Sequence, residues 1–167
     1  MKRNILLIIG AFSGLTIVAQ NKIDIIEEKR PINNIFVTLL GDASLVSINY
    51  EKLFSLSSSC ILVGKLGAGY HGNEYKNGSI SSVLTIPHHL TCNFGKKSLM
   101  AELGIGGTLF SANNYRPYAL YPIAGFRIQP PLPMMVNFRF FVILPVGGFH
   151  GFAHRISPVG LSLGVSF

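Results

Sequence analysis

The chain has 167 residues, enough for a single domain that buries a core or closes a small barrel. Hydrophobic residues make up 49% and charged residues only 13%, and the mean hydropathy is +0.43, so the sequence is far more apolar than an ordinary soluble domain. The net charge of +7 comes from Lys and Arg residues that stand singly or in adjacent pairs, without the cluster that a nucleic-acid surface needs, and we expect no nucleic-acid partner.

The only long apolar run lies at the start of the chain, in residues 4–19. It follows Lys2 and Arg3, is interrupted by glycine and hydroxyl residues, and ends on the small residue Ala19. These features predict a cleaved signal peptide over residues 1–19, the alternative being an uncleaved anchor helix. Mixed charges in residues 20–33 predict a solvated N-terminal extension on the periplasmic side, with a short amphipathic helix as its alternative.

From Asn34 onward, apolar residues alternate with small or polar ones. In the last run, Val159 and every second residue to Phe167 face one way, and only Gly and Ser face the other. An apolar outer face and a small polar inner face suit the wall of a membrane barrel with a narrow lumen. Eight such runs are recognised, over residues 35–40, 44–54, 60–71, 79–94, 99–109, 118–129, 134–144 and 158–167.

Short and long connections take turns along the chain, so the predicted fold is all-β, a single eight-stranded antiparallel up-and-down transmembrane β-barrel over residues 34–167. Gly41, Asp42 and Ala43 predict a tight reversal, and Pro87 predicts a distortion of the fourth run at His88 and His89. The connections predicted beside both termini are 55–59, 95–98 and 130–133. Those predicted at the outer end are 72–78, 110–117 and 147–157. Aromatic residues expected to form an interfacial girdle at the outer rim are Tyr70, Tyr75, Phe110, Tyr115, Tyr118 and Phe149.

The same alternation is compatible with a soluble eight-stranded barrel of lipocalin type, in which the apolar face would point inward. A face in contact with bulk water would carry more Lys, Glu and Asp than the Gly- and Ser-rich face of these runs. The sequence therefore favours the membrane barrel.

The signal peptide, the eight alternating runs and the final residues Leu161-Ser162-Leu163-Gly164-Val165-Ser166-Phe167 resemble the small eight-stranded outer-membrane β-barrel proteins of Gram-negative bacteria, the class that includes the transmembrane domain of outer membrane protein A. The resemblance covers nearly the whole mature chain. It implies a monomer in the cell outer membrane, in contact with lipid and lipopolysaccharide. It also implies insertion by the barrel assembly machinery, with Leu163, Val165 and Phe167 as the recognition signal. No catalytic residue or cofactor comes with the resemblance.

Charged residues on the predicted lumen face form the candidate site. A charge inside a narrow barrel is nearly dry, so we expect it to be paired. Glu102 is interpreted as the only acid on that face, and we predict that it pairs with Arg127 or Arg139. With Lys65, these residues would form a structural plug, the alternative being a gate for a small ion path. The other residues predicted to face the lumen are His89, Asn93, Gln129 and Asn137.

The sequence offers little that indicates an enzyme or a metal site. Serines are plentiful, but we identify no nucleophile elbow and no Ser–His–acid constellation. His71, His150 and His154 could meet in the outer loops, but no Cys or carboxylate completes a ligand set. Cys60 and Cys92 are predicted to lie near one rim as free thiols, with a disulfide as the alternative.

We therefore predict a non-enzymatic barrel with no cofactor and a structural or surface-interaction role through its outer loops. The alternatives are an outer-membrane enzyme that acts on lipid A or phospholipid, and a soluble ligand-binding barrel of lipocalin type.

Overall fold

The computed structural model describes residues 31–43, 45–57, 59–76, 79–95, 98–111, 116–130, 132–149 and 156–167. The predicted signal peptide and almost all of the predicted N-terminal extension lie outside these residues. Within them, no helix is long and apolar enough to cross a membrane.

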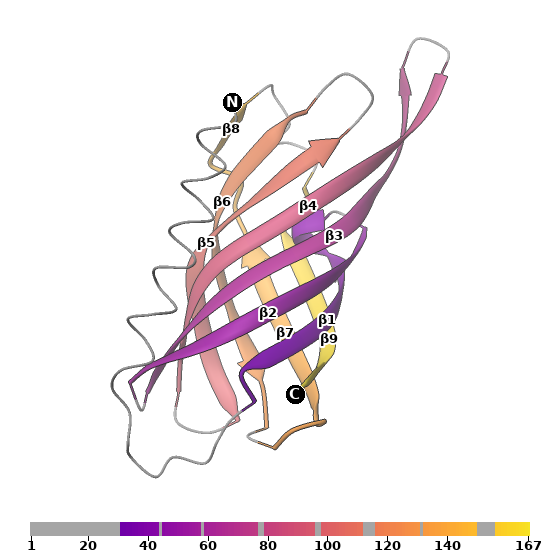
Figure 1. The fold of residues 1–167 in the computed structure, drawn as a ribbon. Coiled ribbons are helices and arrows are strands. Elements are labelled where there is room, and N and C mark those ends of the chain that lie inside the picture. The colour runs from indigo at the N-terminus through magenta and orange to yellow at the C-terminus, as the bar shows by residue number, and fades with distance from the viewer. Residues whose placement is uncertain are drawn as a thin grey trace, which may run out of the picture.

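The described chain forms nine antiparallel strands and one short 3-10 helix (Figure 1). In chain order they are β1 (Asn33–Leu40), η1 (Gly41–Ala43), β2 (Val46–Ser57), β3 (Cys60–Lys76), β4 (Ser79–Phe94), β5 (Leu99–Ser111), β6 (Tyr118–Ile128), β7 (Val136–Ile143), β8 (Gly147–Phe149) and β9 (Val159–Ser166).

The sheet closes into a barrel. Its order is β5-β4-β3-β2-β1-β9-β7-β6, and β6 pairs in turn with β5. Strands β7 and β8 share one place in the wall, because both pair with β6. The molecule is therefore an eight-stranded antiparallel up-and-down barrel, as predicted. The short strand β8 corrects the predicted loop 147–157, and Pro145, which has no N–H to donate, lies in the break between β7 and β8.

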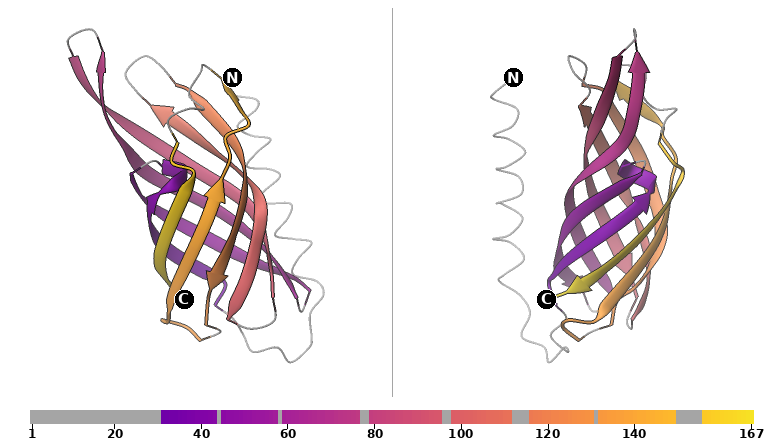
Figure 2. Two further views of the ribbon diagram at one scale, coloured as in Figure 1. Left: turned by 180° about the vertical axis from the view of Figure 1, so that it is seen from behind. Right: turned by 90° about the vertical axis from the view of Figure 1, so that its right-hand side faces the viewer.

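Both ends of the described chain meet at one end of the barrel. The first strand, β1, pairs with the last, β9, and Figure 2 shows the two side by side. Asn33 and Phe167 exchange two backbone hydrogen bonds, of 3.2 and 2.9 Å, at the start of this seam. The closing contact of the barrel is therefore made by the terminal residues whose pattern suggested a barrel.

Strand β3 is longer than predicted. It continues through the predicted loop 72–78 as far as Lys76, which pairs with Ser79, while β4 has its predicted bounds. The alternating pattern is not needed there, because a two-stranded ribbon that extends beyond the barrel encloses no lumen.

The predicted distortion at Pro87 is smaller than expected. Pro87 keeps its place opposite Thr108 on β5, while on the β3 side the pairing is interrupted at Gly67 and Ala68 and resumes in the same register. The shift of register lies instead between Tyr70 and Gly72, at the base of the ribbon. Proline thus costs the ladder local hydrogen bonds without displacing the strand.

The turn between β1 and β2 folds into the barrel. Leu40 and Gly41 both have left-handed backbones, with φ of 61° and 67°, and they direct η1 inward. The helix η1 then contacts β3, β4, β5, β7 and β9 as well as β1. Figure 1 shows it inside the wall of strands. The predicted tight reversal is present, but it belongs to the interior and not to the rim.

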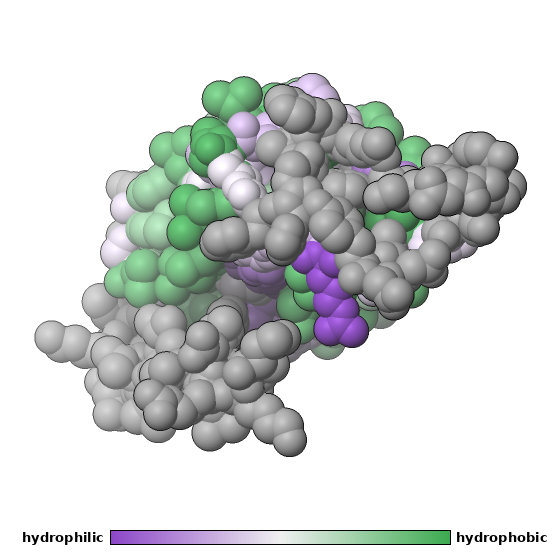
Figure 3. Space-filling view, turned by 90° about the horizontal axis from the view of Figure 1, so that it is seen from above, coloured by the Kyte–Doolittle hydropathy of each residue, from purple (hydrophilic) through white to green (hydrophobic). Residues whose placement is uncertain are grey.

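The two faces of the wall differ in where their charged residues lie. Outward side chains are large and apolar on every strand of the eight-membered wall, with exposed fractions such as 64% for Ile48, 59% for Ile105 and 58% for Leu163. Inward positions hold the buried polar and charged residues. Viewed from above, hydrophobic residues lie along the outer margin and hydrophilic ones lie toward the middle (Figure 3).

Candidate functional site

The candidate site is the barrel interior, and its centre is a cluster of four charged side chains from four strands. Arg139 on β7 donates from Nε and Nη2 to the two carboxylate oxygens of Glu102 on β5, both at 2.6 Å. Arg127 on β6 donates from Nη1 and Nη2 to Glu51 on β2, at 2.7 and 3.1 Å. Bidentate pairs of this kind are the strongest ion pairs that a guanidinium forms. We call these four residues the strand cluster.

The two pairs of the strand cluster are cross-linked. Nη2 of Arg127 lies 3.7 Å from Glu102, and Nη1 of Arg139 lies 3.9 Å from Glu51. Each acid therefore faces both guanidinium groups, and all four side chains are 1% exposed or less. An arrangement with two buried charges of each sign satisfies the condition under which buried charges are tolerated.

A second cluster is built around the inward turn η1, and we call it the turn cluster. The carboxylate Oδ2 of Asp42 lies 2.5 Å from Nζ of Lys65 on β3 and 3.0 Å from Nε2 of His89 on β4. The backbone carbonyl of Asp42 accepts a 2.7 Å hydrogen bond from Thr108 on β5. Tyr121 on β6 completes the network, 2.6 Å from the Thr108 hydroxyl and 3.3 Å from His89. One turn is thus tied to four strands.

His89 joins the two clusters and has a defined tautomer. Its Nδ1 lies 3.3 Å from Nη2 of Arg139, and a guanidinium can only donate. Nδ1 must therefore be the acceptor, which puts the proton of the neutral ring on Nε2, where it is donated to Asp42. A continuous chain of polar contacts runs from Lys65 through Asp42, His89 and Arg139 to Glu51.

The formal charges of this interior cancel. Among the described residues, the buried acids are Asp42, Glu51 and Glu102, and the buried permanent cations are Lys65, Arg127 and Arg139. Aromatic faces add to the stabilisation of the cations: Phe141 lies under Arg139 at 4.3 Å from the ring centroid, and Phe36 lies under Arg127 at 5.4 Å. A balanced and stacked set of charges fits a fixed structural filling.

Apolar side chains fill the interior on both sides of the charges. One cluster, near the end with the termini, consists of Leu53, Ile61, Val63 and Met100. The other, toward the opposite end, consists of Val83, Phe110, Ala119, Tyr121, Ile123, Phe141, Ile143 and Ile156. Phe110 is therefore wrong as a member of the predicted outer girdle, since an even-numbered position on β5 points inward, where it is fully buried.

An amide and hydroxyl network lies below the strand cluster, beside the β1–β9 seam. Ser166 donates to Asn34 at 2.7 Å, and Gln129 donates to the same two residues at 3.2 and 3.3 Å. Asn137 donates to Ser166 as well. These residues belong to β1, β7 and β9 and to the end of β6, so the network ties the seam to its neighbours.

The structure buries Lys65, Glu102, Arg127 and Arg139, the four residues predicted to fill the lumen, and it also buries His89, Asn93, Gln129 and Asn137. Glu102 takes Arg139 as its main partner, with Arg127 at a longer distance. The interpretation of Glu102 as the only inward acid of the predicted strands is wrong, because Glu51 is buried too. Asp42, which lies outside those strands, is a further buried acid. Glu51 shares the inward face of Ser47 and Asn49, so alternation alone could have found it. No periodic sequence pattern indicates that the turn that carries Asp42 points inward.

A sequence pattern associated with hydrolases was also missed. Residues 160–164, Gly-Leu-Ser-Leu-Gly, match G-x-S-x-G, although we identified no nucleophile elbow. The structure places them inside strand β9, with no strand-to-helix turn. Ser162 is 2% exposed, and its hydroxyl lies 2.8 Å from that of Thr38 in the lumen. The match is therefore structural, and the small Gly and Ser side chains leave room for the aromatic rings opposite.

The histidines and cysteines that the structure describes do not assemble into a larger site. His88 and His89 point to opposite faces: His88 stacks on Tyr118 outside the barrel, with Nε2 2.8 Å from the phenol oxygen. Among the described residues, no group of three or more His, Cys, Asp or Glu could hold a metal ion. His150 and His154 lie outside the described residues. Cys60 and Cys92 are free thiols in diagonal register, Cys60 opposite Phe94 and Cys92 opposite Leu62.

Comparison with protein-family models, with curated proteins and with solved structures gives no match. The interpretation of the interior therefore rests on its own geometry. Among the described residues of the lumen, Asp42 and His89 form an acid–base pair, and its two side chains are 1% exposed or less, out of reach of a substrate.

Proposed function

We propose that the protein is a non-enzymatic outer-membrane β-barrel with a side-chain-filled lumen, and that it has a structural or surface-interaction role. The observation that carries the proposal is the apolar belt, by which we mean the outward side chains of the eight-stranded wall. An apolar exterior around a charged interior is the reverse of a soluble barrel.

The belt is continuous around the wall. Large apolar residues that are more than 40% exposed occur on every strand from β1 to β7, and Leu163 on β9 is 58% exposed. Among the outward positions of the described strands whose side chains are placed, the only formal charge is on Lys52, near the end that holds the termini. Its ammonium lies 5.9 Å from the ring of Phe54. A water-facing surface of this area would carry many charges.

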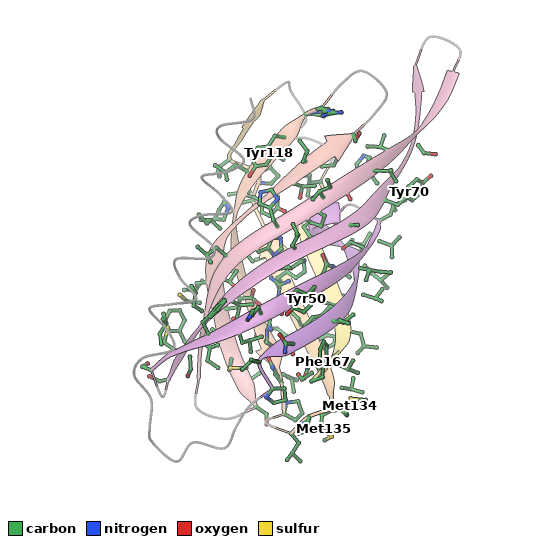
Figure 4. The ribbon with its side chains drawn as sticks, in the orientation of Figure 1. Tyr50, Tyr70, Tyr118, Met134, Met135 and Phe167 are labelled. Atoms are coloured by element: carbon green, nitrogen blue, oxygen red, sulfur yellow. The ribbon has the colours of Figure 1, made fainter. Side chains whose placement is uncertain are left out.

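Aromatic and methionine side chains lie toward the two ends of the belt. Figure 4 shows Tyr70 and Tyr118 in the half that bears the ribbon, and Phe167, Met134 and Met135 at the opposite end, with Tyr50 between them and the middle. Tyr70 and Tyr118 on one side of the belt and Tyr50 on the other are the amphipathic rings that suit two membrane interfaces. Of the predicted outer girdle, the side chains of Tyr75, Tyr115 and Phe149 lie outside those that the structure describes.

The filled interior supports the proposal that the protein has neither an ion pore nor a catalytic site. The lumen charges are paired, neutral as a set and flanked by apolar clusters on both sides. An ion path would need water between these groups, and a catalytic group would need contact with a substrate. Filling by side chains is the usual state of a barrel of eight strands.

The last strand supports the proposed route of insertion. Leu163, Val165 and Phe167 are 58%, 37% and 47% exposed and lie on the outer face. They are therefore accessible to the barrel assembly machinery before the β1–β9 seam forms. The other partners proposed are lipid and lipopolysaccharide around a monomeric barrel.

Envelope fractionation combined with heat-modifiable migration on a denaturing gel tests this proposal. We expect the protein in the outer-membrane fraction, and we expect unheated protein to migrate differently from heated protein because the closed barrel resists detergent. Recovery in the soluble periplasm would instead favour the lipocalin-type alternative. Turnover of lipid A or phospholipid by the purified protein would contradict the absence of an enzymatic role.

A pair of belt variants makes the membrane test quantitative. Arginine at a lipid-facing position costs about 2–4 kcal/mol at the middle of the bilayer and about 0–1 kcal/mol near its surface. Leu103→Arg in the middle of β5 should therefore impair folding into vesicles strongly, and the matched control Leu99→Arg at the start of the same strand should impair it weakly. Equal effects of the two substitutions would count against a membrane-spanning belt.

A further inference from the structure

The barrel carries a two-stranded ribbon that projects from the end opposite the seam contact of Asn33 and Phe167. It is formed by Gly72–Lys76 of β3 and Ser79–Val83 of β4, which pair antiparallel along their whole length. Figures 1 and 2 show it rising beyond all the neighbouring strands. The register shift between Tyr70 and Gly72, with φ of 131° at Gly72, lies at its base and turns it away from the wall.

The ribbon has a free edge on β3. The ladder between β2 and β3 ends at the pair of Val46 and Tyr70, so in the described strands the residues from Asn73 to Lys76 pair only with β4. Their remaining backbone N–H and C=O groups point to the side where a further strand would bind. A free edge is a template for strand addition unless charges or prolines block it.

The sequence of this edge is symmetric about Tyr75. Residues 72–78 read Gly-Asn-Glu-Tyr-Lys-Asn-Gly. Glycine and asparagine occur at equal distances on both sides of Tyr75, and Glu74 before it corresponds to the oppositely charged Lys76 after it. In antiparallel pairing of the edge with a second copy, Tyr75 stands opposite Tyr75, and Glu74 stands opposite Lys76 at two equivalent positions. Opposite charges in directly facing positions stabilise a sheet, and like charges destabilise it.

We propose that the β3 edge of the ribbon binds the same edge of a second copy of this chain, with a twofold axis through Tyr75. Such an interface is self-complementary, as twofold contacts must be. The occupant is a second copy of the chain, because Glu74 and Lys76 are complementary to the same two residues of an antiparallel copy, whereas a strand with like charges at these positions would be disfavoured. The two barrels meet with their ribbon ends facing each other, since antiparallel β3 strands point in opposite directions.

This inference goes beyond the proposed function and does not depend on it, because it concerns the ribbon outside the barrel and can be tested in detergent solution. A pairing of a few residues is weak in a single contact. It becomes effective where many copies on two facing surfaces meet at once, and this last step, unlike the pairing itself, rests on the proposed membrane location.

Disulfide trapping tests the position of the twofold axis. In a Cys60→Ser/Cys92→Ser background, Tyr75→Cys puts a thiol on the axis, where residues that face each other have Cβ atoms about 4.5–5.5 Å apart. Asn73→Cys is the matched control, since it lies on the same ribbon but off the axis. We expect air oxidation of the purified barrel to give covalent dimers from Tyr75→Cys much faster than from Asn73→Cys. Equal rates would indicate random collision and overturn the proposal.

Charge reversal provides the second test, in the same Tyr75→Cys background. Glu74→Lys alone and Lys76→Glu alone each place like charges opposite each other, and each should lower the trapping rate roughly tenfold. The double variant Glu74→Lys/Lys76→Glu should regain the parental rate. An equimolar mixture of the two single variants, at the same total concentration, should regain about half of it, because half of the encounters bring unlike variants together. Loss without recovery in the double variant and in the mixture would overturn the self-pairing. Heat-modifiable migration of every variant verifies that the barrel itself is intact.

Discussion

The strand cluster and the turn cluster hold charges of both signs in one lumen, yet they are built in different ways. In the strand cluster, Glu51, Glu102, Arg127 and Arg139 all project from the closed wall, and two bidentate pairs of 2.6–3.1 Å fix them. In the turn cluster, Asp42 comes from η1, which enters the lumen from the connection between β1 and β2. The strand cluster cannot open without opening the barrel. The turn cluster could release its acid by a movement of a few residues.

This difference predicts how each cluster responds to the loss of one charge. A charge on the wall that loses its partner has no route to water, so its full desolvation penalty lowers the free energy of unfolding. A charge beside a short turn that loses its partner can be hydrated again when the turn moves out of the lumen. Variants that remove one partner from each cluster therefore distinguish a rigid cluster from a releasable one.

The largest effect is expected for Arg139→Met. It leaves Glu102 without either of its 2.6 Å hydrogen bonds and leaves Glu51 with one guanidinium in place of two. Removal of one member of a buried ion pair costs about 3–5 kcal/mol. Urea unfolding in detergent micelles, followed by circular dichroism or gel migration, measures the loss.

The control for this prediction is the double variant Arg139→Met/Glu102→Gln. It removes both charges of the pair, and we expect it to regain most of the lost stability, because an uncharged buried pair needs no counter-ion. A single variant as stable as the parent would contradict the structural role of the strand cluster. So would a double variant that recovers nothing.

A smaller effect is expected for Asp42→Asn, which keeps the shape of the side chain and removes the charge that neutralises Lys65. We expect a loss of about 1–3 kcal/mol, since the amide can still accept a hydrogen bond and the turn can let water reach Lys65. Hydrogen exchange should become faster at residues 41–43 and stay unchanged along the β1–β9 seam. An Asp42→Asn/Lys65→Met control restores the charge balance and should slow the exchange again. Exchange that is unaltered in Asp42→Asn would show that the turn is held without its charge.

The contrast between the clusters also explains what the sequence could predict. Alternation places Lys65, Glu102, Arg127 and Arg139 on the inner face, because a strand in a closed wall has one degree of freedom, its register. Glu51 follows from the same rule through Ser47 and Asn49. Without Glu51 among the predicted lumen acids, either Arg127 or Arg139 could be the partner of Glu102. Glu51 decides between them, because it is the acid that binds Arg127.

Asp42 could not be predicted in the same way. A Gly-Asp-Ala turn has no period, and whether it points to solvent or into the lumen depends on the residues that receive it. These residues lie on distant strands: Lys65 on β3, His89 on β4 and Thr108 on β5. The space for the turn also depends on Phe141 and Gly160, which lie opposite. The direction of the turn therefore depends on tertiary contacts, which a local sequence pattern does not reveal.

The packing around the turn leads to the next prediction, Gly160→Ala. A Cβ at residue 160 would lie 2.2 Å from Cζ of Phe141, whose ring also lies under Arg139 and beside Gly41. Forcing this ring away costs about 1–3 kcal/mol in a close-packed interior. Gly147→Ala is the matched control, because a Cβ there has nothing within 4 Å, and we expect no measurable change. Thermal unfolding of the two variants compares a packed glycine with an unpacked one.

The smallest effect is expected outside the wall, for Tyr118→Phe. The phenol oxygen of Tyr118 lies 2.8 Å from Nε2 of His88, and the two rings remain stacked when the hydroxyl is removed. The lost hydrogen bond is only partly buried, so we expect about 0.5–1 kcal/mol. Tyr121→Phe is the internal counterpart, since its hydroxyl contacts Thr108 at 2.6 Å and links the turn cluster to β6. A larger loss for Tyr121→Phe, measured by the same urea unfolding, would show that the hydroxyls inside the barrel contribute more than those on its belt. Equal losses would mean that the turn cluster is as loosely held as the outer surface.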